Sequence, residues 1–539
     1  MKESLKYLSR LTASMVNTTT YNDNAIPTTF NQAMKWPDLW MEPMLKELAV
    51  MKEKKVFCTL PRPIGKNMVK SKWVYANKYN DKGHIVVRKA RLVVKGFTQI
   101  LEEDYDETYT SVARLESVQL VCVIATSLSL RLWQVDFVSA FLNSKNTFKI
   151  YMKQPLGFDE EGDKVWLLLK TLYGTMQGAY DWAITLNCTY TEHRYYTSKA
   201  DSQVQSKVIN RELTLTTTWT DNVLGASTTP AGKVEAKGEL RSSYEIKDLR
   251  EMKHILSMKI KRTDNGSIKL LQHAYSECIL ESFGMAEAKS HSTLLPPEIT
   301  LSIKDSPETQ DKADEIKGVP YHEALGLLMW LQVATRPDLS YTVNLLLCFA
   351  HNPRQAHWNV LKHALSYVKG TLDYGITYFC NSSFYPFGYI NSDYAGDVDR
   401  RKSTEGHMFF VGGRLVSWAS KRQETITLLT FEAEYMAFTQ ATQQALWLTK
   451  FMEEICMPQQ TPICIFDDNT GAIANTQNNK NHWHTKHINI KHHFMKKKVV
   501  MQSIEFNYVS SSENLADILT KPLTKEAVVR CCVGIGIRG

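Results

Sequence analysis

Three short apolar runs that end in acidic residues place the strongest constraint on the fold of this chain. Leu-Trp-Gln-Val-Asp ends at Asp136, Leu-Thr-Thr-Thr-Trp-Thr-Asp ends at Asp221, and Ile-Cys-Ile-Phe-Asp-Asp ends at Asp467 and Asp468. A carboxylate at the end of a buried strand costs desolvation energy unless it is paired or binds a metal. Two such strands side by side can hold the two divalent ions of a phosphoryl-transfer site. The alternative is an Asp that begins a turn after a strand.

A helical pattern over residues 431–455 adds a carboxylate to the third run. Glu434 shares one face with small or apolar residues at three- and four-residue steps, namely Ala437, Ala441, Ala445 and Leu448. Small residues let a helix approach a sheet closely, so Glu434 is expected near Asp468. Asp517 precedes the apolar pair Ile518-Leu519. If the fold brings Asp393, Glu434, Asp468 and Asp517 together, they suit Mg²⁺ with water ligands.

Length and composition indicate an ordinary globular chain. Its 539 residues suggest about three to four domains. A hydrophobic content of 43% and a charged content of 22% exclude a disordered chain, a fibre or a coiled-coil rod. The ten cysteines include no Cys-x-x-Cys pair, and the N-terminus lacks a signal-peptide core. We therefore expect an intracellular protein, cytoplasmic or also nuclear, without a membrane partner; the apolar stretch 120–130 is expected to be a buried helix.

The order of periodic segments predicts α+β or α/β units with at least two cores. Residues 1–27 resemble a polar linker. The expected elements are a helix over 30–51 capped by Asn31, strands over 56–97 with a hairpin turn at 81–83, helix–strand–helix over 116–160, short strands around one helix over 213–272, helices over 321–370 broken at 336–338, and strands at 385–390, 406–418, 463–466 and 504–509.

The formal net charge of +8 is unevenly distributed. The segment 52–95 holds thirteen Lys and Arg against two acidic residues, and the stretch between Asp468 and Glu505 holds six Lys and no acidic residue. The rest of the chain is therefore acidic overall. Two basic segments of this kind favour a polyanionic partner.

The second basic segment also contains five histidines: His482, His484, His487, His492 and His493. Their spacing matches no common zinc site and no cysteine lies among them. We favour a basic loop and helix in which Lys486, Lys491 and Lys496 contact phosphates. A zinc site and a solvated surface without a partner remain the alternatives.

Longer motifs give the chain a specific resemblance. The stretches are KSKWVYANKY (70–79), RKARLVVKGFTQ (88–99), DYDETYTSVARLESV (104–118), QVDFVSAFLN (134–143), IYMKQPLGF (150–158), LYGTMQG (172–178), TRPDLSY (335–341), DRRKSTEGHMFFVGG (399–413), FEAEYMA (431–437), TKHINIKHHF (485–494) and LADILTKPL (515–523). With these motifs the chain closely resembles the reverse transcriptase and ribonuclease H region of Ty1/copia-type retrotransposon polyproteins. No Asp-Ser/Thr-Gly protease motif and no integrase zinc motif occurs, so the resemblance is to the downstream part of such a polyprotein.

The resemblance implies a right-hand polymerase with fingers, palm and thumb, followed by a ribonuclease H-like α/β domain. The expected boundaries are a reverse transcriptase at 28–298, a connection at 299–384, a ribonuclease H-like domain at 385–525 and a tail at 526–539. Implied substrates and partners are an RNA template, a DNA primer, an RNA–DNA hybrid and deoxynucleoside triphosphates. The implied cofactor is Mg²⁺, or Mn²⁺ in its place.

The resemblance also implies roles for individual residues. Asp136 and Asp221 fall on palm metal ligands, while Lys89, Arg91 and Gln177 fall near the incoming nucleotide. Glu434 and Asp468 fall on nuclease metal ligands, and Asp517, with Asp393, completes the expected catalytic carboxylates.

Several positions depart from the family pattern. The family's YVDD reads WTDN here, so Asn222 replaces the second carboxylate, and the nuclease strand reads Asn391-Ser392-Asp393, so Asn391 replaces the first. Met176 and Tyr180 replace a Lys and an Arg. These changes predict a degenerate copy of an RNA-directed DNA polymerase with ribonuclease H activity. The alternatives are a catalytically inactive remnant that binds nucleic acid, and a structural adaptor that holds partners through residues 336–338.

Overall fold

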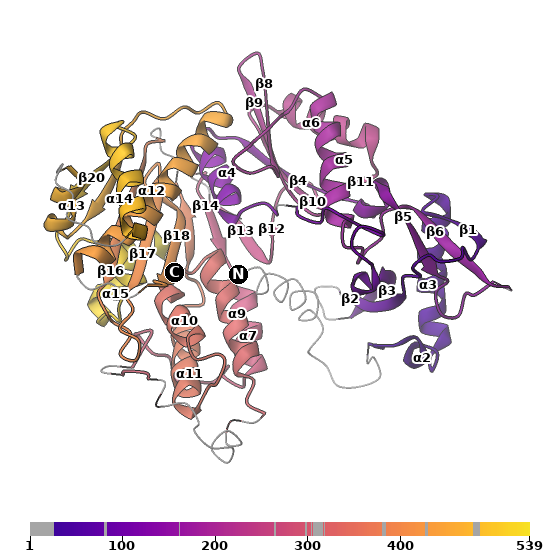
Figure 1. The fold of residues 1–539 in the computed structure, drawn as a ribbon, viewed down its shortest axis with the longest axis horizontal. Coiled ribbons are helices and arrows are strands. Elements are labelled where there is room, and N and C mark those ends of the chain that lie inside the picture. The colour runs from indigo at the N-terminus through magenta and orange to yellow at the C-terminus, as the bar shows by residue number, and fades with distance from the viewer. Residues whose placement is uncertain are drawn as a thin grey trace.

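The computed structural model describes residues 26–79, 84–110, 112–160, 162–263, 266–296, 299–302, 304, 316, 318–379, 384–425, 430–477 and 486–538. The chain forms an elongated molecule in which the fingers sheets lie at one end, the palm sheet lies in the middle and a mixed sheet with its helices lies at the other end (Figure 1). The proposed polar linker at 1–27 falls almost wholly outside the described residues. Within the described part, no helix is both long and apolar enough to cross a membrane.

The fingers combine two helices with two small antiparallel sheets. The elements are α2 (Phe30–Ala33), α3 (Pro37–Glu53), the sheet β1 (Phe57–Pro61)–β6 (Lys164–Lys170)–β5 (Lys145–Lys153), the hairpin β2 (Ser71–Tyr79)–β3 (Ile85–Val94), and the 3-10 turn η2 (Gly96–Thr98). The pairing of β2 with β3 confirms the predicted hairpin, whose turn residues lie outside the described part. The predicted single helix over 30–51 is wrong: Thr29 caps a short first helix, and Pro37 starts the second, as suits a residue whose missing N–H is needed by no partner there.

The palm is a six-stranded sheet with helices on both faces. Its strand order is β11 (Ile246–Asp248), β4 (Arg131–Phe137), β10 (Asn222–Ser227), β9 (Glu212–Trp219), β8 (Val204–Ile209) and β7 (Tyr196–Thr197), and its helices are α4 (Leu115–Ser127), α5 (Gly178–Glu192) and α6 (Pro230–Ser243). The predicted buried helix is confirmed as α4. The predicted helix after β4 is wrong, because a 3-10 turn, η3 (Ala140–Asn143), leads there into strand β5.

Alternation along β4 decides which of its side chains can reach a ligand. Trp133, Val135 and Phe137 point into the aromatic core under α5 and α6, whereas Leu132 packs on the opposite face in the core that includes α4. Side chains two residues apart share a face, so Asp136 lies on the same face of the sheet as Leu132. The strand therefore ends with a half-buried carboxylate at the edge of the core.

Gly225 is required by the packing of this sheet. It lies opposite Trp133 in the β10–β4 register, and a Cβ on residue 225 would come within 2.1 Å of the Trp133 indole. We expect Gly225→Ala to lower the free energy of unfolding by about 1–3 kcal/mol, measured by urea denaturation. Gly238→Ala is the matched control, since nothing lies within 4 Å of that added methyl group and alanine favours a helix by about 0.5–1 kcal/mol. Equal stability of the two variants would contradict this packing.

A third sheet crosses the predicted domain boundaries. It runs β12 (His254–Ile255), β13 (Met258–Arg262), β14 (Ile268–Leu271), β15 (Gly375–Tyr378) and β21 (Ile537–Arg538), beside α7 (His273–Ser282), α9 (Tyr321–Ala334), η5 (Pro337–Leu339), α10 (Ser340–Leu347) and α11 (Gln355–Gly370). The sheet joins strands from the predicted polymerase, connection and tail. The tail is corrected to α15 (Lys525–Gly534) and β21, because Cys531 and Cys532 are buried and β21 pairs with β15.

Residues 336–338 are internal rather than an adaptor surface. Arg336 Nη2 donates to Asp338 Oδ2 at 2.8 Å, and Arg336 Nη1 donates to the Thr371 carbonyl at 3.1 Å. Both charged side chains are at most 2% exposed. The adaptor hypothesis is therefore wrong in its proposed site, because a partner cannot reach this ion pair.

The last unit is a mixed five-stranded sheet. Its order is β18 (Arg414–Arg422), β17 (Thr404–Val411), β16 (Pro386–Asp393), β19 (Ile463–Asp467) and β20 (Ile504–Tyr508), with α12 (Thr430–Glu454), α13 (Thr470–Gln477), α14 (Lys486–Val500) and η6 (Leu515–Leu519). The first three strands are antiparallel, while β16–β19 and β19–β20 are parallel. This α/β unit lies where the resemblance implies a ribonuclease H-like domain.

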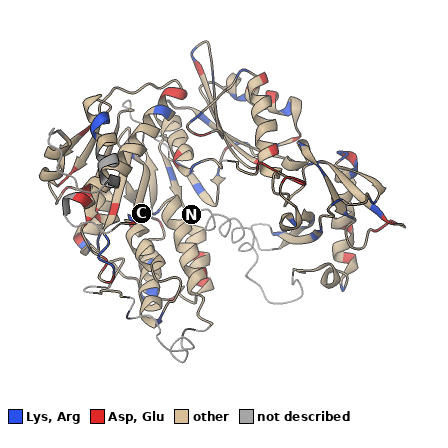
Figure 2. Ribbon diagram, viewed as in Figure 1, with Lys and Arg blue, Asp and Glu red and all other residues tan. Residues whose placement is uncertain are grey.

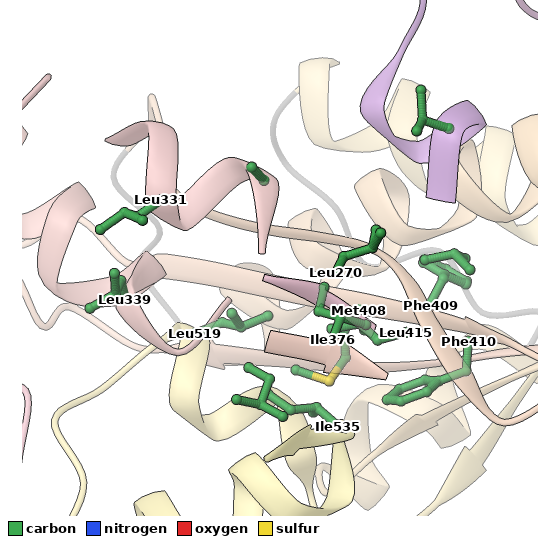
Figure 3. Packing of buried hydrophobic residues seen from close by; sticks show 14 of the residues in the cluster. Leu270, Leu331, Leu339, Ile376, Met408, Phe409, Phe410, Leu415, Leu519 and Ile535 are labelled. Carbon is green, nitrogen blue, oxygen red and sulfur yellow. The ribbon is translucent and has the colours of Figure 1, made fainter. Parts of the chain in front are cut away.

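One apolar core unites this unit with the third sheet. Residues from α9, β15, β17, η6 and the segment after α15 pack together in Figure 3, among them Leu331, Ile376, Met408, Phe409, Leu519 and Ile535. The C-terminal end of α12 also docks on the palm. Glu454 Oε2 accepts hydrogen bonds from Ser198 Oγ at 2.6 Å and Ala200 N at 3.0 Å, and Trp447 Nε1 donates to the Ala200 carbonyl at 3.0 Å.

Candidate active sites

The β4 strand and the β9–β10 hairpin bring Asp136 and Asp221 together. Asn222 lies directly opposite Asp136 in the β10–β4 register, and Phe137 N donates to the Asp221 carbonyl at 2.7 Å. The hairpin turn consists of Thr220 and Asp221, because Trp219 pairs with Asn222. The Asp221 carboxyl group is therefore carried to the end of β4 by a two-residue turn.

The turn itself is strained. Thr220 has a φ of +56°, a region that β-branched residues rarely occupy and that costs roughly 1–3 kcal/mol. Trp182 Nε1 holds the Thr220 carbonyl through a hydrogen bond of 2.7 Å. Backbone strain of this kind persists where the surrounding structure holds the residue in place. Here the hydrogen bond from Trp182 holds the turn and so fixes the position of Asp221.

The two carboxylates repel one another. The pKa of Asp136 is raised, first by burial and second by the charge of Asp221, while Lys247, Lys78 and Lys89 act in the opposite direction. A divalent cation would offset this repulsion, and oxygen ligands are those that Mg²⁺ prefers. The donor set fits a cation that takes two protein carboxylates and completes its shell with phosphate and water oxygens.

Asn222 belongs to the same cluster but contributes an amide. Its Nδ2 donates to Asp221 Oδ1 at 3.3 Å, and its Oδ1 accepts from Gln134 Nε2 at 3.2 Å. The amide therefore orients Asp221 and adds no negative charge. Asn222, which stands where the family pattern has a second carboxylate, lies beside both Asp136 and Asp221.

A cavity of about 250 Å³ opens above the two aspartates. Its walls carry the cationic residues Lys89 and Arg91 of β3 and Lys247 of β11, together with Glu47 of α3 and Tyr173. The Arg91 guanidinium lies over the Tyr173 ring at 5.0 Å. Burial and the neighbouring cations Lys78, Arg91 and Lys247 lower the pKa of Lys89. Figure 2 shows how the basic and acidic residues are distributed over the molecule.

Gln177 lies elsewhere. It is 1% exposed, accepts a hydrogen bond from Gln99 Nε2 at 3.1 Å and donates to the Asp104 carbonyl at 3.3 Å. It does not line the cavity that contains Lys89 and Arg91. Its position favours a role in holding the segment around Gln99 and Asp104.

Sequence reasoning missed several residues that line the cavity, among them Lys247, Glu47 and Tyr173. Lys247 reaches it because β11 pairs with β4, and no local pattern predicts a pairing over that distance along the chain. Glu47 arrives on a helix whose periodicity predicted only its buried face. Tyr173 had a signal, since it lies inside the LYGTMQG motif.

The nuclease acids lie on four elements. Asn391 and Asp393 are on β16, Glu434 is on α12, Asp468 follows β19 and Asp517 is in η6. Asn391 Nδ2 donates to Asp517 Oδ1 at 2.7 Å, so the fold joins these two positions across 126 residues of chain. The predicted buried face of α12 is confirmed, since Glu434, Ala437, Ala441, Ala445 and Leu448 are all at most 3% exposed.

Two carboxyl groups of this region, Glu434 and its neighbour Asp467, are deeply buried. Burial, followed by the charges of Asp467 and Asp468, raises the pKa of Glu434 well above its usual range. Asp467 is 0% exposed, and burial together with Asp468 raises its pKa to about 7. Neither carboxylate oxygen of Asp467, nor Oε2 of Glu434, has a hydrogen-bond partner among the described atoms.

Asp393 lies close to the turn that follows its strand. Its carboxylate packs against the turn after β16, so that a Cβ on Gly396 would lie 1.9 Å from Asp393 Oδ2. Burial raises its pKa, and the charge of Lys521 lowers it. Across the described ranges, no group of three or more His, Cys, Asp or Glu side chains is arranged to hold a metal ion. The nuclease donor set departs from the multi-carboxylate metal site that the resemblance implies, because Asn391 supplies an amide bonded to Asp517 where that site has a carboxylate.

The basic helix is described only in part. The backbone of α14 includes Lys486 and Lys491, but their side chains, those of His487 and His492, and the whole of His482 and His484 lie outside the described residues. Lys496 is half-buried and His493 is exposed. Phosphate contacts by this helix, and the zinc alternative, both stay predictions.

Comparison with known proteins agrees with this architecture. Residues 54–297 match the family described as reverse transcriptase (RNA-dependent DNA polymerase). The chain is 33% identical over 522 residues to the retrovirus-related Pol polyprotein from transposon TNT 1-94 of Nicotiana tabacum, covering 96% of this chain and 39% of that protein. It is 30% identical over 517 residues to the corresponding polyprotein from transposon RE2 of Arabidopsis thaliana, covering 95% of this chain and 35% of that protein.

A solved structure aligns at lower similarity. The foamy viral protease-reverse transcriptase in complex with RNA/DNA hybrid gives a TM-score of 0.49 at 11% identity, covering 97% of this chain and 62% of that chain.

The family match and the strand-end carboxylates define residues 54–297 as a reverse transcriptase domain. A ribonuclease H-like domain follows it. The whole chain is similar to the retrovirus-related Pol polyproteins of transposons. It spans between a third and two fifths of the length of the curated relatives named above.

Proposed function

We propose that this chain carries out RNA-directed DNA synthesis at the polymerase centre, at a rate limited by Asn222. The observation that carries the proposal is the pair Asp136 and Asp221 at the base of a cavity with a cationic wall. The substrates would be deoxynucleoside triphosphates, an RNA template and a DNA primer. Asp136 and Asp221 would hold Mg²⁺, or Mn²⁺ in its place.

The cationic and the acidic residues of this site would have different roles. Lys89, Arg91 and Lys247 would neutralise the triphosphate, and the Tyr173 ring would keep the Arg91 guanidinium in place. When bound, a divalent cation supplies charge stabilisation to the attacking and leaving oxygens of an in-line displacement. Asp136 and Asp221 would set the position of the cation. Asn222 would orient Asp221 without adding a negative charge to the site.

Primer extension on an RNA template tests this proposal. We expect Asn222→Asp to raise the rate by about tenfold to a hundredfold in Mg²⁺, because a carboxylate beside Asp136 binds a cation more strongly than an amide does. Asn222→Ala is the matched control, since it removes the hydrogen bonds to Asp221 and Gln134 and adds no charge. Equal rates for the wild-type chain and Asn222→Asp would contradict a limiting role for Asn222.

A second candidate function is favoured for the nuclease domain, namely binding of an RNA–DNA hybrid without cleavage. Asn391 occupies a carboxylate position and bonds to Asp517, so the cutting centre is incomplete. Binding would rest on backbone charge and the shape of the hybrid. Robust hybrid cleavage by the wild-type chain would overturn this candidate and would mean that Asp393 suffices.

If the chain is an inactive remnant, neither the wild-type chain nor Asn222→Asp extends a primer. Salt-sensitive binding to a primer–template would still be observed in that case. A binding measurement run beside the extension assay therefore separates a dead polymerase from a chain that has lost its nucleic-acid surface.

A further inference from the structure

Two donors converge on one carboxylate oxygen in the nuclease domain. Asn391 Nδ2 lies 2.7 Å from Asp517 Oδ1, and Lys521 Nζ lies 2.9 Å from the same atom. We propose that Asn391 and Lys521 replace a divalent cation as the elements that hold this centre together. The inference goes beyond the polymerase function proposed above and does not depend on it.

The contact is built into the core rather than formed on the surface. Asn391 is 4% exposed and Asp517 is 5% exposed. Asn391 Nδ2 also donates to Thr520 Oγ1 at 2.6 Å, and Asn514 Nδ2 ties η6 to β16 through the Ile390 carbonyl at 2.8 Å. The amide thus bonds the carboxylate and the hydroxyl group of a segment that is already fixed to the strand.

The amide matters because of what a carboxylate would do in its place. An Asp at residue 391 would bring a second negative charge to hydrogen-bond distance from Asp517 Oδ1. Two buried carboxylates at that distance need a cation or a proton between them. The neutral Asn391 removes that requirement and supplies a donor instead.

Lys521 provides the positive charge of the centre. It follows Asp517 by four residues, which lets its side chain reach back along η6. Burial raises the pKa values of Asp517, Asp393 and Glu434, and the charge of the Lys521 ammonium group acts in the opposite direction on all three. One fixed cation therefore contacts Asp517 and acts through its charge on two more of the four predicted carboxylates.

The full chain can be tested by hydrogen exchange of the peptides that cover β16 and η6, measured in EDTA and in millimolar MgCl₂. For the wild-type chain we expect the same protection in both conditions. For Asn391→Asp we expect protection to fall by about tenfold or more in EDTA and to return in MgCl₂. The polymerase aspartates are the same in both proteins, so a Mg²⁺ effect confined to these peptides reports the nuclease centre alone.

Lys521→Gln keeps the test decisive if Asn391→Asp does not fold. This variant retains a donor but removes the charge, and we expect η6 to lose protection in EDTA and regain it in MgCl₂. Lys525→Gln is the matched control, because Lys525 is exposed in the next helix, and it should behave as the wild-type chain does. The proposal is overturned if Mg²⁺ protects β16 and η6 of the wild-type chain, or if Lys521→Gln exchanges at wild-type rates in EDTA.

Discussion

Asp136→Asn, introduced into the Asn222→Asp chain, is expected to reduce DNA synthesis on an RNA template by roughly a thousandfold. The change removes one of two carboxylates at the base of the cavity, and metal-held charge is worth several kcal/mol to a phosphoryl-transfer transition state. The backbone partner of β4 is unaffected, because Phe137 N, not the Asp136 side chain, bonds to the Asp221 carbonyl. Single-turnover primer extension at saturating nucleotide measures the effect.

Asp159→Asn is the control for this experiment, since Asp159 is an exposed carboxylate of the fingers region. It should leave the extension rate unchanged. Binding of the primer–template should survive in both variants, because phosphate contacts rest on Lys and Arg. Retention of more than about a tenth of the rate by Asp136→Asn would contradict a metal-holding role for Asp136.

The strand-end carboxylates were predictable because their cause is local. A short apolar run that ends in Asp specifies a buried strand and places one carboxylate at its end. Asp136 and Asp221 meet because β10 pairs with β4. The same reasoning predicted the small-residue face of α12, on which Glu434 is buried.

The missed features depend on pairings between distant segments. β21 completes a sheet that begins at β12, so the predicted tail is part of the core. Lys247 joins the polymerase cavity only through the pairing of β11 with β4. Local periodicity carries no information on which distant strands will be neighbours, and the resemblance places boundaries by motif rather than by sheet.

Asp467 and Asp468 are adjacent in sequence but have different environments, since Asp467 lies in the core and the resemblance assigns Asp468 to the nuclease site. The nuclease motif drew attention to the pair 467–468, and the family role falls on Asp468. Successive strand residues point to opposite faces, so Asp467 joins Ile463 and Ile465 on the buried face. The alternation was readable in the sequence, and it predicts a carboxyl group among apolar side chains.

This burial makes the stability of the chain depend on pH. The pKa of Asp467 is about 7 in the folded chain and about 3.9 in an unfolded chain. Between these values the folded state binds more protons than the unfolded state, so stability falls as pH rises through that window. Asp467 alone is expected to lower stability by about 3 kcal/mol more at about pH 8 than at about pH 5.

Asp467→Asn removes the titrating group and keeps the shape of the side chain. We expect the variant to gain stability over the wild-type chain by about 3 kcal/mol more at about pH 8 than at about pH 5. Urea denaturation in EDTA at the two pH values measures this difference. Comparison of the two chains cancels opposing contributions such as that of half-buried His407, whose pKa is lowered by desolvation to about 4.

Glu505→Gln provides the matched control, because Glu505 lies on the neighbouring strand β20 with its side chain exposed. Its stability relative to the wild-type chain should not change with pH by more than a few tenths of a kcal/mol. If Asp467→Asn behaves like Glu505→Gln, Asp467 is ionised in the folded chain at neutral pH. A cation, or a hydrogen bond donated by protonated Glu434, must then compensate the negative charge of Asp467. In that case the buried face of β19 would belong to the nuclease centre rather than to the core.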